Sequence, residues 1–134
     1  MRIPEAIVDS VWRRYARDGR KIERMTFPDG TADAIDLEAG PGGGSVLRSD
    51  GMVFEWGGDA VDFVTLRVAD ERTIVRCLAI AARRRLPELR AALPTRSQDA
   101  VDCASCAGHG FLDLGEHPKA IVCFACDGLG WVAA

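Results

Sequence analysis

Apolar residues near the start of the chain recur with the period of a helix. Four of them are spaced at intervals of four: Ile3, Ile7, Val11 and Tyr15. This spacing places them on one side of a helix, so residues 4–18 are predicted to form a helix with one buried stripe. Pro4 suits its first turn, and Gly19 suits its C-terminal end.

The pattern then changes to strands separated by turn residues. Two hairpins are predicted, over residues 21–38 around Pro28-Asp29-Gly30 and over residues 45–57 around Ser49-Asp50-Gly51. A fifth strand is predicted after Gly57 and Gly58, with the apolar residues Val61, Phe63, Val64, Leu66 and Val68. Between the hairpins, the glycine-rich run 40–44 predicts a flexible loop, because no phosphate-loop lysine follows it. Together these runs predict a meandering antiparallel sheet with one face for a helix to cover.

A second helical stretch covers residues 70–93, with Asp70 or Thr73 as the N-terminal cap. Its apolar stripe comprises Ile74, Cys77, Leu78, Ala81 and Ala82. Pro87 predicts a break near residue 85 followed by a short second helix, because an internal proline clashes with the preceding turn. Pro94 ends the stretch, and the polar residues 95–102 predict a linker.

These elements predict an α+β protein with an N-terminal domain at 1–94, a linker at 95–102 and a small cysteine-rich module at 103–134. Of 134 residues, 48% are hydrophobic and 28% charged, which is typical of a folded globular protein. The net charge of −3 offers no global attraction to nucleic acid or anionic lipid. No membrane span or signal peptide is expected, so the predicted location is the cytoplasm, where cysteines remain reduced.

The C-terminal module is a repeat of the pattern C-x-x-C-x-G-x-G. The first copy begins at Cys103 and the second at Cys123, and each contributes a pair of cysteines. The four predicted metal ligands are Cys103, Cys106, Cys123 and Cys126. Two C-x-x-C pairs at this separation are typical of a structural zinc site, in which four thiolates surround one Zn²⁺ as a tetrahedron. The glycines permit the positive φ angles that turn the chain back after each pair.

The doubled motif resembles the cysteine-rich zinc domain of DnaJ-type co-chaperones. In that family four such motifs form two zinc centres, so the two motifs in residues 103–131 imply one centre. The resemblance also implies a role in binding unfolded polypeptide or other proteins. It does not extend to the J domain, because the one His-Pro pair, His117-Pro118, is followed by lysine and lies between the zinc motifs.

The sulfur atoms and the two histidines also allow other chemistry. The resemblance also allows reversible thiol-disulfide chemistry. A rubredoxin-like iron site is less consistent, because rubredoxin places glycine directly after the second cysteine of each pair, where this chain has Ala107 and Asp127. His109 and His117 are expected to be exposed loop residues, and Cys77 is expected to be a small buried hydrophobe.

The other candidate features concern surfaces. The apolar residues of the module are expected to pack partly on the N-terminal domain and partly against a partner: Phe111, Leu112, Phe124, Leu129 and Trp131. Five arginines give the second helix a basic character that suits either a solvated helix end or phosphate binding: Arg76, Arg83, Arg84, Arg85 and Arg90. The acidic residues are scattered and form no evident pair for acid–base catalysis: Asp29, Asp33, Asp36, Glu38, Asp59 and Asp62.

The sequence therefore predicts a non-enzymatic zinc protein that binds another protein, as an adaptor or chaperone-like accessory. One alternative is a small bacterial inhibitor or immunity protein that blocks a partner enzyme. Another is a nucleic-acid-associated regulator that uses the arginine helix, although nucleic acid is not the favoured partner. An adaptor would suppress aggregation of a denatured client, an inhibitor would capture one stoichiometric partner, and a nucleic-acid binder would show steeply salt-dependent retention.

Overall fold

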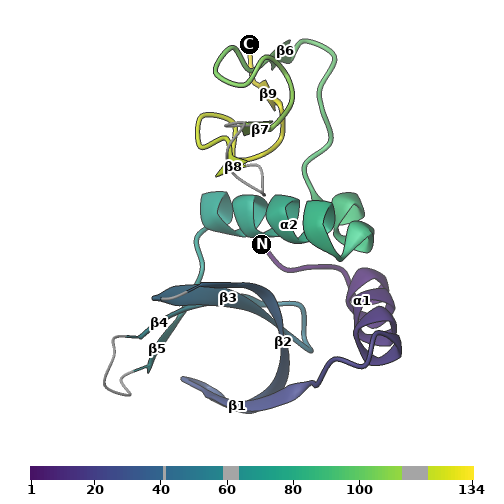
Figure 1. The fold of residues 1–134 in the computed structure, drawn as a ribbon, viewed down its shortest axis with the longest axis vertical. Coiled ribbons are helices and arrows are strands. Elements are labelled where there is room, and N and C mark those ends of the chain that lie inside the picture. The colour runs from purple at the N-terminus through teal and green to yellow at the C-terminus, as the bar shows by residue number, and fades with distance from the viewer. Residues whose placement is uncertain (41, 59–63, 113–120) are drawn as a thin grey trace.

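The computed structural model describes residues 1–40, 42–58, 64–112 and 121–134. Its main elements are α1 (Glu5–Arg17), β1 (Glu23–Phe27), β2 (Gly30–Gly40), β3 (Gly43–Arg48), β4 (Val53–Gly58), β5 (Val64–Val68), α2 (Glu71–Arg84) and the 3₁₀ helix η1 (Pro87–Ala92). Four two-residue strands follow: β6 (Val101–Asp102), β7 (Phe111–Leu112), β8 (Ile121–Val122) and β9 (Trp131–Val132). Figure 1 shows a curled sheet, two helices on its outer side, and the C-terminal hairpins stacked on α2. The predicted α+β class is confirmed.

Strands β1 to β5 pair in sequence order, and each pair is antiparallel, so the predicted meander is confirmed. The expectation of a loop throughout residues 40–44 is wrong. Strand β2 extends to Gly40, which pairs with Gly43 at the start of β3. At Gly44, a Cβ atom would lie 2.7 Å from Nε1 of Trp56, so the glycine allows the Trp56 ring to cross this strand. Of the predicted fifth strand, residues 61 and 63 lie outside the described residues.

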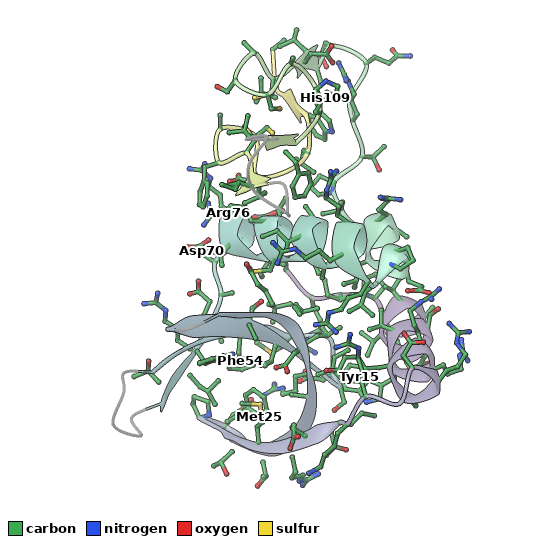
Figure 2. The ribbon with its side chains drawn as sticks, in the orientation of Figure 1. Tyr15, Met25, Phe54, Asp70, Arg76 and His109 are labelled. Atoms are coloured by element: carbon green, nitrogen blue, oxygen red, sulfur yellow. The ribbon has the colours of Figure 1, made fainter. Side chains whose placement is uncertain are left out.

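The sheet buries apolar side chains on both faces, although the alternation along the strands predicted one face for a helix. The outer face packs on α1, α2 and η1, with side chains such as Ile35, Leu47 and Val53. The inner face of the curl holds a second cluster, formed by Phe27, Ala34, Val46 and Phe54. Figure 2 shows Phe54 and Met25 inside the curl. The curvature lets one sheet supply both layers of this inner cluster, and a register shift between Asp36 and Glu38 interrupts the regular pairing of β2.

A buried arginine is part of the inner cluster. The Arg48 side chain is 6% exposed and binds Asp29 and Asp50, with nitrogen–oxygen distances of 2.6 Å in each pair. Its guanidinium also lies 5.1 Å from the ring centre of Phe27 and 4.8 Å from that of Phe54. The two carboxylates satisfy the charge, and the rings cover the guanidinium, so Arg48 links the turn after β1 to the turn after β3.

This arrangement predicts a specific acid sensitivity. Hydrogen bonds from Arg48 are the largest cause that lowers the pKa of both Asp29 and Asp50 below the usual 3.8. A lowered folded-state pKa stabilises the fold above the unfolded pKa, and the contribution is lost as pH falls through the folded value. We expect the free energy of unfolding to fall below about pH 4, and Arg48→Met to flatten that dependence. Urea denaturation between pH 2 and 7 measures it; an unchanged acid slope in Arg48→Met would contradict the assignment.

Helix α2 begins and ends where the sequence indicated. Asp70 caps it by accepting a hydrogen bond of 2.8 Å from the N–H of Thr73, and Pro87 opens η1 after a break. The predicted stripe is buried, but so are three further residues, Val75, Ala79 and Ile80. The helix is therefore enclosed on more than one side, because the sheet covers one flank and the C-terminal module lies over another (Figure 1). Among the described residues, no helix combines the length and the apolar character that a membrane span requires.

Candidate metal centre

The two cysteine motifs fold into two copies of the same turn. In each copy the residue after the second cysteine has a left-handed φ, 53° at Ala107 and 56° at Asp127. The two following glycines of each copy also have positive φ. This series of positive φ angles turns the chain back toward the sulfur atoms, and glycine adopts such angles at no steric cost at the second and fourth positions after each pair.

Backbone hydrogen bonds join the two turns to each other. The N–H of Cys123 donates to the carbonyl of Gly110, and the N–H of Cys103 donates to the carbonyl of Gly130, both at 2.9 Å. Two short strand pairs also join the turns: β7 pairs with β8, and β6 pairs with β9. The last two residues of the predicted linker 95–102 form β6. Arg96 also binds Asp102 at 2.9 Å, which fixes the entry to the module.

The four predicted cysteines come together between the two turns. Their sulfur atoms all lie within 4.8 Å of one another, and all four side chains are buried. The Sγ atoms of Cys103 and Cys123 are 3.9 Å apart, and those of Cys106 and Cys126 are 3.8 Å apart. A tetrahedron with metal–sulfur bonds of about 2.3 Å has edges of about 3.8 Å, whereas a disulfide needs about 2.05 Å. The spacing suits a shared metal ion and not a disulfide.

Backbone donors stabilise negative charge on these sulfurs. The N–H of Gly110 donates to Sγ of Cys106 at 3.1 Å, and the N–H of Gly130 donates to Sγ of Cys126 at 3.2 Å. Burial raises the pKa of Cys106, but the Gly110 hydrogen bond and the neighbouring thiols outweigh it and lower the pKa. Burial raises the pKa of Cys126, and neighbouring thiols add to that rise. A thiolate at Cys106 is therefore favoured and one at Cys126 opposed, and a bound cation would favour the ionised form of both.

The module is attached to α2 mainly by one carboxylate. Asp127, in the second turn, binds Arg72 at 3.0 Å and Arg76 at 3.1 Å. The Asp127 and Arg76 side chains are only 15% and 23% exposed, so this pair is shielded from water. Arg72 also donates to the carbonyl of Phe124, and the Arg76 guanidinium lies 4.8 Å from the Phe124 ring centre. Sequence reasoning missed Asp127, although two arginines four residues apart on one helix face were a signal that an acidic partner faces them.

Apolar and stacking contacts complete the attachment. The Arg83 guanidinium lies 4.6 Å from the ring centre of Phe111. Gly128 approaches α2 so closely that a Cβ there would lie 2.7 Å from Cβ of Ala79. Of the five arginines that the sequence singled out, Arg76 and Arg83 contact the module, whereas Arg83, Arg84 and Arg90 are exposed to solvent.

Arg85, the two histidines and Cys77 lie outside the contact between α2 and the module or outside the described residues. Arg85 turns toward the sheet, where it donates to the carbonyls of Asp36 and Leu37. His109 is exposed and lies outside the sulfur cluster, whereas His117 falls outside the described residues. Cys77 is buried as expected, at 6% exposure, and burial raises the pKa of its thiol.

The apolar residues of the module divide as expected between packing and exposure. Phe111, Leu112, Leu129 and Trp131 are half-buried, whereas Phe124 is 60% exposed. Some of the scattered acidic residues form ion pairs: Asp29 with Arg48, and Asp33 with Arg24. Asp59 and Asp62 lie outside the described residues.

The four cysteines form the one cluster of three or more potential metal-binding side chains within the described part of the chain. The four sulfur atoms lie around one point. A metal ion bound by all four would therefore have no coordination position left for a water molecule or a substrate. The arrangement therefore suits a structural metal ion that holds two turns together. Comparison with protein-family models, with curated proteins and with solved structures found no match to this chain.

Proposed function

We propose that residues 101–132 form a zinc finger with one structural Zn²⁺, of the type found in the cysteine-rich domain of DnaJ co-chaperones. The support is chemical: four thiolates in tetrahedral spacing suit Zn²⁺, and two N–H···S hydrogen bonds offset their charge. The sulfur–sulfur distances of 3.8–3.9 Å between the two turns match the edges of a four-thiolate zinc tetrahedron and exceed the length of a disulfide bond.

The finger serves, in this proposal, as a rigid mount for a protein-binding surface. The observation that carries the proposal is Phe124, a large apolar side chain of the second turn that is 60% exposed. Ile121, 38% exposed, lies three residues before it in β8. Exposed aromatic residues held on a rigid backbone are typical anchors of protein interfaces, because little entropy is lost when they bind.

A cleft adjoins this exposed pair. We name it the Phe124 cleft: it has a volume of about 580 Å³ and lies between β3, α2 and the second turn. Ser45, Cys77 and Ile80 form part of its lining, together with Phe124 and Ile121 at the module's side. A volume of this size accommodates one or two side chains of a partner. The proposed function is thus a non-enzymatic adaptor or chaperone-like accessory that receives an apolar segment here.

The proposal is tested with Phe124→Ser and a matched control, Val68→Ser. Val68 is also an exposed apolar residue, at 56% exposure, but it lies on β5. The zinc-loaded protein is mixed with luciferase, and light scattering is followed as the luciferase is denatured by heat. We expect the wild type and Val68→Ser to suppress aggregation equally, and Phe124→Ser to suppress it several-fold less.

Other outcomes favour other functions. Equal suppression by all three proteins, or none by any, would overturn the client-binding role of Phe124. Capture of a single stoichiometric enzyme that the protein inhibits would support the inhibitor alternative. Retention on nucleic acid that falls steeply with salt would support the regulator alternative.

A further inference from the structure

A second hollow surface lies on the opposite flank of α2 from the Phe124 cleft. It consists of two hollows of about 340 and 550 Å³ that share three lining residues, Arg83, His109 and Phe111. We name the two together the arginine groove. On α2, the Phe124 cleft is lined by residues such as Cys77 and Ile80, whereas the groove is lined by Ala79, Ala82 and Arg83. At 100° per residue, Cys77 and Ile80 point on average roughly 140° away from Ala79, Ala82 and Arg83, so the two hollows lie on different flanks of the helix.

The charge of the groove has one sign. Arg83, Arg90 and His109 line it, and no aspartate or glutamate does so among the described residues. The Phe124 cleft, by contrast, carries both signs of charge, because Glu38 and Glu55 line it together with Arg76 and Arg84. A patch with basic side chains alone is unusual for a chain with a net charge of −3, so local and overall charge have opposite signs here.

The walls of the groove are aromatic and aliphatic. Phe111 and Trp131 come from the finger, and Leu93 and Pro94 come from the segment after η1. The guanidinium carbon of Arg83 lies 4.6 Å from the ring centre of Phe111, and Arg83 is exposed, so its N–H groups are accessible to a ligand. The groove thus combines apolar walls with cationic donors at its edge.

The charge of a zinc–thiolate centre explains only part of this pattern. Four thiolates and one Zn²⁺ carry a formal charge of about −2, and Arg83 and His109 share a hollow with Cys106. Arg90 does not share it: Arg90 lines the other hollow, beside Trp131 and Leu129, and no cysteine lines that hollow. Neutralising the negative charge of the metal centre can therefore account for Arg83 and His109, but it does not account for the position of Arg90 beside Trp131.

We propose that the arginine groove binds an acidic polypeptide segment that carries an aromatic or large aliphatic side chain. Aspartate or glutamate would pair with Arg83 and Arg90, and the apolar side chain would pack between Trp131 and Leu93. A polypeptide suits the groove better than nucleic acid, because three basic groups neutralise few phosphates and the overall charge is negative. This inference goes beyond the proposed function, since it places a second, chemically different site on the other flank of α2.

Fluorescence anisotropy tests the proposal with the full-length zinc-loaded protein. The probe is a fluorescein-labelled decapeptide of aspartate and glutamate with one central tryptophan. Three comparison ligands are used: the same peptide with lysine in place of every acid, the same peptide with alanine in place of tryptophan, and a single-stranded DNA decamer. We expect the acidic tryptophan peptide to bind at least about tenfold more tightly than each of the other three.

Matched variants locate the binding. Arg90→Glu is expected to weaken the acidic peptide about tenfold or more, because it places a like charge beside the ligand. Lys21→Glu makes the same change of charge at a side chain that is 83% exposed and far along the chain, and it is expected to alter binding less than about twofold. Phe124→Ser is expected to leave the affinity for this peptide unchanged.

Three results would overturn the groove. They are the absence of binding by the acidic peptide, equal weakening by Arg90→Glu and Lys21→Glu, or tighter binding of the DNA decamer. The two proposals also fail separately. Loss of acidic-peptide binding in Phe124→Ser, with Arg90→Glu unaffected, would assign the peptide to the Phe124 cleft and remove the groove. Loss of client protection in Phe124→Ser with no peptide binding would retain the proposed function alone.

Discussion

Replacement of Cys106 by serine is expected to release the metal and unfold the finger, while the helix-and-sheet domain remains folded. Metal binding in sites of this size supplies roughly 10–16 kcal/mol of apparent folding free energy. The main core has its own apolar residues from α1, α2 and the sheet, with Val11, Leu47 and Leu78 fully buried. Loss of the finger therefore removes one layer of the protein and leaves the main core in place.

Loss of the finger is also expected to affect α2. Val75 and Ala79 are buried, at 5% and 4% exposure, and Ala79 lies directly under Gly128 of the finger. Cys106→Ser is expected to uncover this flank, so amide hydrogen exchange should quicken in residues 101–132 and more modestly along α2. Native mass spectrometry reports the metal, and far-ultraviolet circular dichroism reports the remaining fold.

Cys77→Ser provides the matched control, because Cys77 is also buried but lies outside the sulfur cluster. It is expected to retain one zinc and an intact finger. Global loss of ellipticity in Cys106→Ser would show that the sheet domain depends on the finger, and full zinc retention would show that Cys106 is not a ligand.

The second large effect is expected from Gly110→Ala. Gly110 has a φ of 80°, and a Cβ there would lie 2.4 Å from the carbonyl oxygen of Gly128. That oxygen belongs to the backbone of the partner turn, so it cannot move aside as a flexible side chain would. The same substitution also shifts the Gly110 N–H that donates to Cys106. We expect a marked loss of zinc affinity, measured by competition with a chromogenic chelator.

Gly19→Ala separates the two causes. Gly19 has a φ of 72°, close to that of Gly110, but a Cβ there meets no atom within 4 Å. The left-handed conformation alone costs roughly 1–2 kcal/mol, and Gly19→Ala should lower stability by about that amount with unchanged zinc affinity. If Gly110→Ala behaves like Gly19→Ala in both measurements, the close packing of the two turns is not what holds the site.

Local signals account for the parts of this protein that the sequence indicated correctly. The period of α1, the turn residues at Pro28 and Asp50, the cap at Asp70 and the break at Pro87 all act over a few residues. The sulfur cluster belongs to the same class, because each C-x-x-C-x-G-x-G turn is determined by its own glycines, and one shared cation accounts for their meeting. These features follow from backbone and thiol chemistry that needs no distant partner.

Only the tertiary structure shows which groups the helices and strands contact on each of their faces. The strand pattern could not show that the sheet curls, because alternation marks an apolar face but not the layer that covers it, and the inner cluster forms only when β1 bends back toward β4. The charge pattern of α2 likewise did not show what its arginines contact. They resemble a solvated face in the sequence, but in the structure Asp127, 51 residues beyond Arg76, supplies the opposing charge. The sequence by itself thus determined the elements and the thiolate set. Contacts between distant residues determined which charged and apolar side chains remain available for binding, because a side chain's role depends on the group that the fold places opposite it.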